Sequence, residues 1–290
     1  MPTPSPIELR ALSKPRPVVV GYLRGPAGDA ALAAGAAEAR LRNVPLVILH
    51  KLVGGEAPEA FGRGESDVDH RRVAIARLAA IAHDRVPDLA QVDVRVVTTP
   101  IAEELIVHSK TASLVVLGVT SKHASTAALF DTVPRELAHH SYSPVMVVPA
   151  ATSGTEPARI ICGVDRSTAS IEALHWAARD AERRGVTVLA VEVAESRRGP
   201  SAAPAEVPLS DWVRMHLPPV PTTVVCATER GAPGGRLLQI AKEQHGLLVV
   251  GSQRPGHRIG RSVVRVVSAQ TEVPVVIVPR RVRTPEQPFG

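Results

Sequence analysis

The hydrophobic positions of the chain fall into ten short runs that alternate with amphipathic stretches of helical period. The runs are rich in Val, Ile and Leu and nearly continuous, as in PVVVGYL and GLLVVG. Continuous apolar runs of this length are typical of strands that are buried on both faces of a parallel sheet. The predicted strands are residues 17–21, 44–50, 92–98, 114–118, 144–148, 159–164, 186–193, 222–228, 247–251 and 274–278.

Helical stretches separate most of these strands, and parallel neighbours need such crossover connections. The pattern therefore predicts an α/β fold with a parallel sheet and helices on both faces. In such sheets ligands bind outside the carboxyl ends of the strands, where the strand order reverses. The predicted helices are residues 29–42, 67–86, 100–110, 128–141, 168–184, 208–216, 232–245 and 260–271.

Three apolar motifs occur twice along the chain, in the same order. The offset between the two copies falls from 142 to 133 and then to 130 residues, so the second copy is a shortened version of the first. The matching pairs are PVVVGYL (17–23) with RIICGVD (159–165), SLVVLG (113–118) with GLLVVG (246–251), and SPVMVVP (143–149) with VPVVIVP (273–279).

This repeat divides the chain into two domains, each with five parallel strands. We expect a flexible N-terminal tail (1–16), a first repeat (17–149), a linker (150–158), a second repeat (159–279) and a C-terminal tail (280–290).

The composition excludes several classes of protein. The 290 residues are 44% hydrophobic, which is too apolar for wholesale disorder, and no apolar run approaches the roughly 18 residues of a membrane span. With only two Trp, two Tyr and three Phe, a base-stacking surface for nucleic acid is not expected, and the core must consist of Val, Ile, Leu and Ala.

Cys162 and Cys226 lie within apolar runs and form no CxxC pair, so we expect buried, reduced thiols and no metal site. The N-terminus has no apolar signal region, which favours a cytoplasmic location.

The net charge of +6 is unevenly distributed between the repeats. The first repeat has 13 Lys and Arg against 14 Asp and Glu, and the second has 15 against 11, so their net charges are −1 and +4. A modest basic excess in the second repeat suits an anionic small ligand. We expect neither a nucleic acid nor a membrane as a partner.

A candidate binding residue follows the first strand of the second repeat. The segment GVDRSTAS places Asp165 at the carboxyl edge of the sheet, just before a helix that Ser167 or Thr168 caps. Its carboxylate can accept hydrogen bonds from a ribose hydroxyl or an adenine amino group, or it can merely help to cap the helix. The first repeat has Leu23 at this place, and a leucine side chain accepts no hydrogen bond.

A glycine-containing loop follows the fourth strand of the second repeat. In VVGSQRPGHRIGRSVVRVVS, Gly251, Gly256 and Gly260 precede Ser262 and a predicted helix. Glycines let backbone N–H groups approach an anion, and the start of a helix adds positive potential. The alternative is a surface loop with ordinary turn glycines.

The corresponding loop of the first repeat is poorly suited to a phosphate. No glycine follows Gly118 until Gly154, and Asp131 stands beside Thr132, the counterpart of the second repeat's serine. A carboxylate at that position repels a phosphate group. The first repeat is therefore expected to carry a degenerate nucleotide site and the second a partial one.

Taken together, these motifs resemble the universal stress protein family in its tandem form. The resemblance is carried by GVDRSTAS, by GRSVVRVVS and by the closing strands SPVMVVP and VPVVIVP. The family motif after the fourth strand is Gly-x2-Gly-x9-Gly-Ser/Thr. The second repeat departs from it, because Arg254 and Arg261 stand where the later glycines are expected.

The resemblance implies a Rossmann-like fold of the adenine nucleotide alpha-hydrolase type, with ATP as the ligand. It places Asp165 at the adenosine end of the nucleotide and the backbone of Val193 against adenine. It also implies a regulatory, non-catalytic role in stress adaptation. For assembly it leaves two alternatives: a homodimer formed through the last strands, or pairing of the two domains within one chain.

We therefore expect a regulatory protein that binds ATP or another adenine nucleotide in the second repeat only. Two alternatives stay open: a nucleotide-independent partner-binding protein in which both sites are lost, and a weak ATPase. The sequence contains no Walker A, GxSxG or HExxH motif that would indicate an enzyme.

One irregular segment, residues 194–221, replaces the long helix 67–86 of the first repeat. It contains Trp212 in a short amphipathic piece. That side chain packs either on the sheet or on a partner, and we favour the sheet.

Overall fold

The computed structural model describes residues 15–51, 72–120, 132–152, 156–194, 207–252 and 272–280, except for 74, 78, 82, 83, 85, 87, 88 and 90. The ten predicted strands are all present, and their ends lie within two residues of the predicted ones. They are β1 (Val18–Tyr22), β2 (Leu46–Lys51), β3 (Val92–Val97), β4 (Leu114–Val119), β5 (Val145–Pro149), β6 (Arg159–Val164), β7 (Thr187–Ala194), β8 (Val224–Arg230), β9 (Leu247–Ser252) and β10 (Val275–Pro279).

The ten strands form one sheet in the order β3-β2-β1-β4-β5-β10-β9-β6-β7-β8. Within each repeat all neighbours are parallel, which confirms the prediction of two five-stranded parallel arrangements. The two halves are joined by antiparallel pairing of their last strands, in which Met146 of β5 lies opposite Val276 of β10. Of the two alternatives for the last strands, the structure contains the pairing within one chain.

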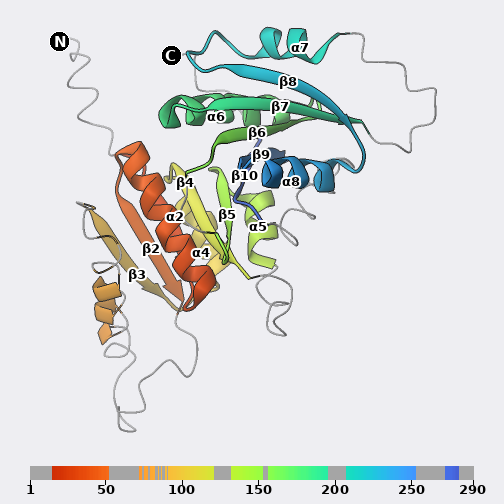
Figure 1. Ribbon diagram of the computed structural model, residues 1–290. Coiled ribbons are helices and arrows are strands. Elements are labelled where there is room, and N and C mark those ends of the chain that lie inside the picture. Colours follow the sequence, from red (N-terminus) through yellow and green to blue (C-terminus); the bar gives the residue numbers. More distant parts are fainter. Residues whose placement is uncertain are drawn as a thin grey trace, which may run out of the picture.

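The antiparallel junction gives the two halves opposite strand directions. The carboxyl ends of β1, β2 and β4 therefore lie along one edge of the sheet, and those of β6, β7 and β9 along the other (Figure 1). Because ligands of this fold class bind at carboxyl ends, the two candidate sites lie on opposite edges and share no residue.

Helices cover both faces of the sheet. The helices of one face are α2 (Pro26–Arg42), α6 (Thr168–Arg184) and α7 (Leu209–His216), and those of the other are α4 (Ile101–Ser109), α5 (Thr132–His140) and α8 (Pro233–Glu243). The described residues between 72 and 84 are also helical, and they pack on the same face as α2. The predicted helix 260–271 lies outside the described residues.

The core is built almost wholly from Val, Ile, Leu and Ala, as the composition predicts. Trp212 of α7 is buried in it, which confirms that this side chain packs on the sheet. Its ring stacks on His216 at 4.4 Å between centroids, and the His216 carbonyl lies 2.6 Å from Nε2 of His175 on α6. Among the described residues, no helix has both the length and the apolar character that crossing a bilayer requires.

A buried cluster of four charged side chains joins α2 to α6. Glu38 and Arg42 of α2 lie 142 residues before Asp180 and Arg184 of α6, so the two pairs occupy equivalent positions of the repeat. Arg42 Nη2 lies 2.6 Å from Asp180 Oδ1, and Arg184 Nε lies 2.8 Å from Asp180 Oδ2. Glu38 accepts from both arginines. Two carboxylates and two guanidinium groups thus neutralise each other across the domain boundary.

Burial by itself lowers the pKa of the Arg184 guanidinium, but the carboxylates of Glu38 and Asp180 outweigh it and raise that pKa above its ordinary value. At the rim of the cluster, Nη1 of Arg184 lies 2.7 Å from the exposed carboxylate of Glu156, which belongs to the linker. The Arg184 guanidinium is therefore charged at physiological pH, and the contacts of Arg42 with Asp180 and of Arg184 with Glu38 exist only while both helices are in place.

Removing one charge of this cluster should destabilise the chain strongly. We expect Asp180→Ala to lower the free energy of unfolding by about 3–5 kcal/mol, because it leaves two buried guanidinium groups without their shared carboxylate. Denaturant unfolding measures this change. The matched control is Glu272→Ala, which breaks the exposed pair with Lys242 and should cost at most about 1 kcal/mol. Equal costs for the two variants would contradict this account.

The two cysteines are free thiols in different environments. Cys162 of β6 is fully buried, and burial raises the pKa of its thiol from 9.0 to about 12. Cys226 of the edge strand β8 is half-buried, and burial raises the pKa of its thiol as well.

Because only a thiolate reacts with disulfide reagents, the two thiols should label at different rates. At pH 8 in the folded protein, we expect Cys226 to react slowly and Cys162 not at all. In denaturant both should react rapidly. Labelling followed by mass analysis of the peptides checks this order, and equal rates in the folded protein would contradict it.

Candidate functional site

The carboxyl edge of the second half brings together three of the predicted site residues. β6 pairs with β9 on one side and with β7 on the other, and the strand order reverses between β6 and β9. Asp165 directly follows β6, Val193 is the penultimate residue of β7, and Gly251 is the penultimate residue of β9. The topology therefore places these residues along one edge, on both sides of the point where the fold class binds its ligands.

Asp165 shapes the turn between β6 and α6. Its Oδ1 accepts hydrogen bonds from the backbone N–H of Ser167 at 3.0 Å and from the Ser167 hydroxyl. Ser167 in turn is the N-cap of α6, where its Oγ accepts from the N–H of Ser170 at 3.2 Å. The carboxylate thus helps to cap α6, which was the alternative to ligand binding expected from the sequence. It is nevertheless exposed, so the same group also faces solvent at the strand end.

An ion pair lies next to this carboxylate. Arg166 Nε lies 2.6 Å from Oε1 of Glu192 on β7, and its Nη2 lies 2.9 Å from Oε2. The third nitrogen, Nη1, donates to the carbonyl of Val207 at 2.9 Å. The hydrogen bonds with Glu192 raise the pKa of the Arg166 guanidinium. We call this set of contacts the Arg166 clamp.

Gly251 brings the start of α6 close to β9. A Cβ at this position would lie 2.4 Å from the carbonyl oxygen of Ala169, in the first turn of α6. Gly118 of β4 has the same relation to Ala27 of α2, with the corresponding distance of 1.8 Å. Both repeats therefore use a glycine to let the first helix lie against the fourth strand.

The residue after Gly251 links this edge to the first half of the molecule. Ser252 is buried, and its hydroxyl donates to the carbonyl of Ala138 in α5. The start of the second repeat's loop is therefore held against a helix of the first repeat.

The equivalent edge of the first half has different chemistry. Leu23 follows β1, and the N-cap of α2 is Gly25, which has no side chain to cap the helix. The position of Glu192 is taken by His50, a buried side chain whose Nδ1 lies 3.1 Å from the carbonyl of Tyr22. This strand end therefore presents an aliphatic side chain where the second half presents a carboxylate.

Several predicted site residues lie outside the described part of the chain. They are Gly256, Gly260 and Ser262 of the second repeat's loop. The corresponding loop of the first repeat, residues 121–131, lies outside it as well. Among the described residues, no group of three or more His, Cys, Asp or Glu side chains is arranged to hold a metal ion.

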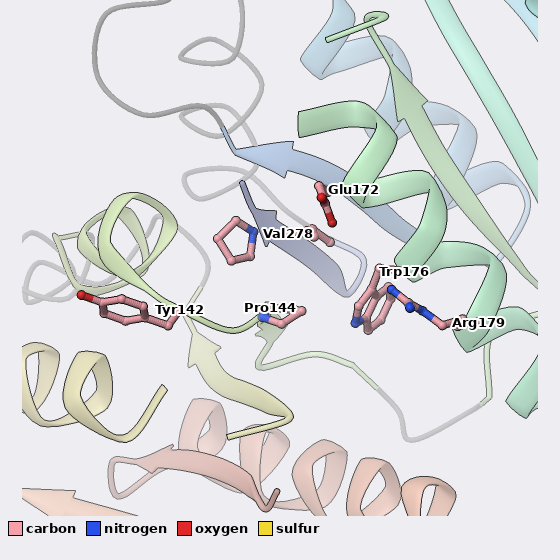
Figure 2. A pocket seen from close by; sticks show the side chains of 7 residues that line it. Tyr142, Pro144, Glu172, Trp176, Arg179 and Val278 are labelled. Atoms are coloured by element: carbon pink, nitrogen blue, oxygen red, sulfur yellow. The ribbon is translucent and has the colours of Figure 1, made fainter. Parts of the chain in front are cut away.

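A small pocket lies where the two halves meet, between α6, the end of β10 and the start of β5 (Figure 2). Its volume of about 20 Å³ is room for a water molecule, whereas a nucleotide needs a site of several hundred Å³. The Trp176 ring lines the pocket, and the guanidinium group of Arg42, a member of the buried charge cluster, lies 5.7 Å from the centroid of this ring. The pocket is thus a feature of the domain junction. Its lining residues are Tyr142, Pro144, Glu172, Trp176, Arg179, Val278 and Pro279.

Neither the Arg166 clamp nor the contact between Ser252 and α5 could be predicted from the sequence. The partners of these contacts are separated by 26 and 114 residues, so no local pattern reveals them. The sequence does contain one indication of the clamp. The repeat aligns Glu192 with His50 and Asp165 with Leu23, so two neighbouring positions differ in charge between the copies.

Similarity to known proteins extends over both repeats of the chain. The model of the universal stress protein family matches residues 15–149 and 157–279. A universal stress protein of Mycobacterium tuberculosis is 32% identical over 297 aligned residues, which cover 92% of this chain and 99% of that protein. The crystal structure of a universal stress protein from Archaeoglobus fulgidus superimposes with a TM-score of 0.61 at 17% identity, over 91% of this chain and 98% of its own. This likeness confirms the Rossmann-like fold.

A shorter universal stress protein, solved in complex with cAMP, covers 48% of this chain and 100% of its own at 22% identity, with a TM-score of 0.35. The cAMP is a ligand of that protein.

The glycine of β9 offers a test of how this edge is built. We expect Gly251→Ala to lower the free energy of unfolding by about 1–3 kcal/mol, because its Cβ would force the first turn of α6 away from β9. The matched control is Gly235→Ala in α8, where a Cβ meets nothing within 4 Å. The control should leave stability unchanged or raise it by up to about 1 kcal/mol. Denaturant unfolding of both variants measures these changes. An unchanged free energy of unfolding in Gly251→Ala would contradict the close approach of α6 to β9.

Proposed function

This chain belongs to the universal stress protein family, and from that premise we propose that it binds one adenine nucleotide, in its second repeat only. The observation that carries the proposal is the exposed carboxylate of Asp165, held at the carboxyl end of β6 beside the reversal of strand order. At the equivalent place the first repeat has Leu23. The carboxylate accepts hydrogen bonds from a ribose hydroxyl or an adenine amino group, and an aliphatic side chain does not.

Two neighbouring residues support the same site. Gly251 lets the N-terminal turn of α6 lie against β9, which brings the positive end of the helix dipole to the strand edge. The backbone of Val193, at the end of β7, is the contact for adenine in this proposal. Gly256, Gly260 and Ser262 complete it as the phosphate contacts, with the basic excess of the second repeat favouring an anion.

We further propose that the bound nucleotide, ATP or another adenine nucleotide, serves regulation in stress adaptation and is not turned over. The support is the family and a sequence without Walker A, GxSxG or HExxH motifs. A cytoplasmic location and the domain limits given above belong to the same proposal.

Titration calorimetry of the full chain with ATP tests the site. We expect at most one ATP per chain, and we expect Asp165→Asn to weaken binding at least about tenfold, the cost of a lost charge-assisted hydrogen bond. The matched control is Asp211→Asn, which changes a partly exposed carboxylate on α7 of the same repeat and should bind ATP as the wild type does.

The outcomes separate the alternatives. Two sites per chain, or unchanged binding by Asp165→Asn, would contradict the proposed site. Release of ADP that is lost in Asp165→Asn would favour a weak ATPase. Failure of every adenine nucleotide to bind would leave a partner-binding protein.

A further inference from the structure

Arg166 combines an uncommon backbone conformation with several side-chain hydrogen bonds. Its φ of 60° lies in the left-handed region, which is disfavoured for a residue that has a Cβ. The Arg166 clamp compensates for this: the guanidinium group contacts both carboxylate oxygens of Glu192 and the carbonyl of Val207. Strained backbone persists only where the surrounding contacts hold it in place.

The strained residue lies inside the turn that holds the candidate ligand group. Asp165 precedes it and Ser167 follows it, and the carboxylate of the first accepts from the N–H and hydroxyl of the second. That pair of hydrogen bonds spans Arg166, so the direction of the Asp165 carboxylate depends on the backbone angles of Arg166.

The first repeat shows what this turn becomes without the clamp. It retains an arginine, Arg24, but it has His50 in place of Glu192 and Leu23 in place of Asp165. There the left-handed region is occupied by the next residue, Gly25, with a φ of 116°. The clamp and the carboxylate thus occur in the same half, and the half that lacks both uses a glycine for its turn.

We propose that Arg166 is a positioning residue for the nucleotide: the Arg166 clamp holds the turn 165–167 in the one conformation that presents the Asp165 carboxylate to the ligand. This inference rests on the proposed function, because it assigns a task to the same site. Arg166 acts through Asp165 and makes no contact with the nucleotide.

The size of the effect follows from the population of that conformation. When a binding-competent state is only partly populated, the apparent dissociation constant rises by the inverse of the populated fraction. An unclamped alanine pays the left-handed penalty, so we expect Arg166→Ala to bind ATP about 5- to 30-fold more weakly. A glycine pays no such penalty, so Arg166→Gly should bind within about threefold of the wild type.

Calorimetry with ATP on the full chain tests this order of affinities among the variants. The set comprises the wild type, Arg166→Ala, Arg166→Gly, Asp165→Asn, the double variant Asp165→Asn/Arg166→Ala, and Glu192→Ala. The control is Arg214→Ala, which removes an exposed arginine paired with Asp211. Thermal unfolding of each variant reports whether it is folded. If Arg166→Ala does not fold, Glu192→Ala, which also opens the clamp, takes its place.

If Arg166 positions Asp165, we expect four results. Arg166→Gly binds better than Arg166→Ala, and Glu192→Ala is weakened like the latter. The double variant binds no more weakly than Asp165→Asn alone, because a residue that acts through Asp165 has no effect once that carboxylate is gone. Arg214→Ala binds as the wild type does.

Other results overturn it. Equal losses in the glycine and alanine variants would mean that the guanidinium group contacts the nucleotide directly. Additive losses in the double variant would mean that it acts independently of Asp165, and wild-type binding by Arg166→Ala would mean that it has no part in the site. In these cases the wild type still binds ATP and the proposed function stands. If the wild type does not bind ATP, the same titrations are made with AMP and ADP, and a wild type that binds no adenine nucleotide overturns the proposed function itself, and this inference with it.

Discussion

The arrangement of the molecule depends on a buried charge cluster to which each half contributes one carboxylate and one guanidinium group. Glu38 and Arg42 of α2 and their repeat equivalents, Asp180 and Arg184 of α6, each find partners across the boundary. Buried charged groups need several hydrogen-bonded partners, and the packing of α2 on α6 gives each of the four groups a partner from the other half. This constraint favours the antiparallel pairing of β5 and β10 beneath them, which joins two five-stranded halves into one sheet.

That junction determines where function can reside. Because the halves run in opposite directions, their carboxyl strand ends lie on opposite edges of the sheet. The contact of Ser252 with α5 joins the second repeat's edge to the first repeat, just before the glycine-containing loop.

The two edges share their scaffold and differ in their chemistry. Gly118 and Gly251 both allow the first helix of a repeat to lie against its fourth strand. The turns before these helices differ, since the first uses Gly25 for its left-handed residue and the second uses Arg166. The carboxylate of Asp165 is accompanied by an ion pair that holds it, and the aliphatic Leu23 is not. A site that binds a ligand needs such support, because its groups must be oriented before the ligand arrives.

The sequence by itself determined the ten strands, the repeat, the parallel order within each half and Asp165 at a strand end, because apolar periodicity and strand-to-helix turns are local properties of the chain. The same reasoning placed Trp212 on the sheet and Cys162 in the core. Only the tertiary structure decided how the last strands pair, how Arg42 meets Asp180 and how Arg166 meets Glu192. These contacts join residues far apart in the chain through buried charges and shared hydrogen bonds, whose partners are set by the packing of whole elements and leave no periodic pattern in the sequence.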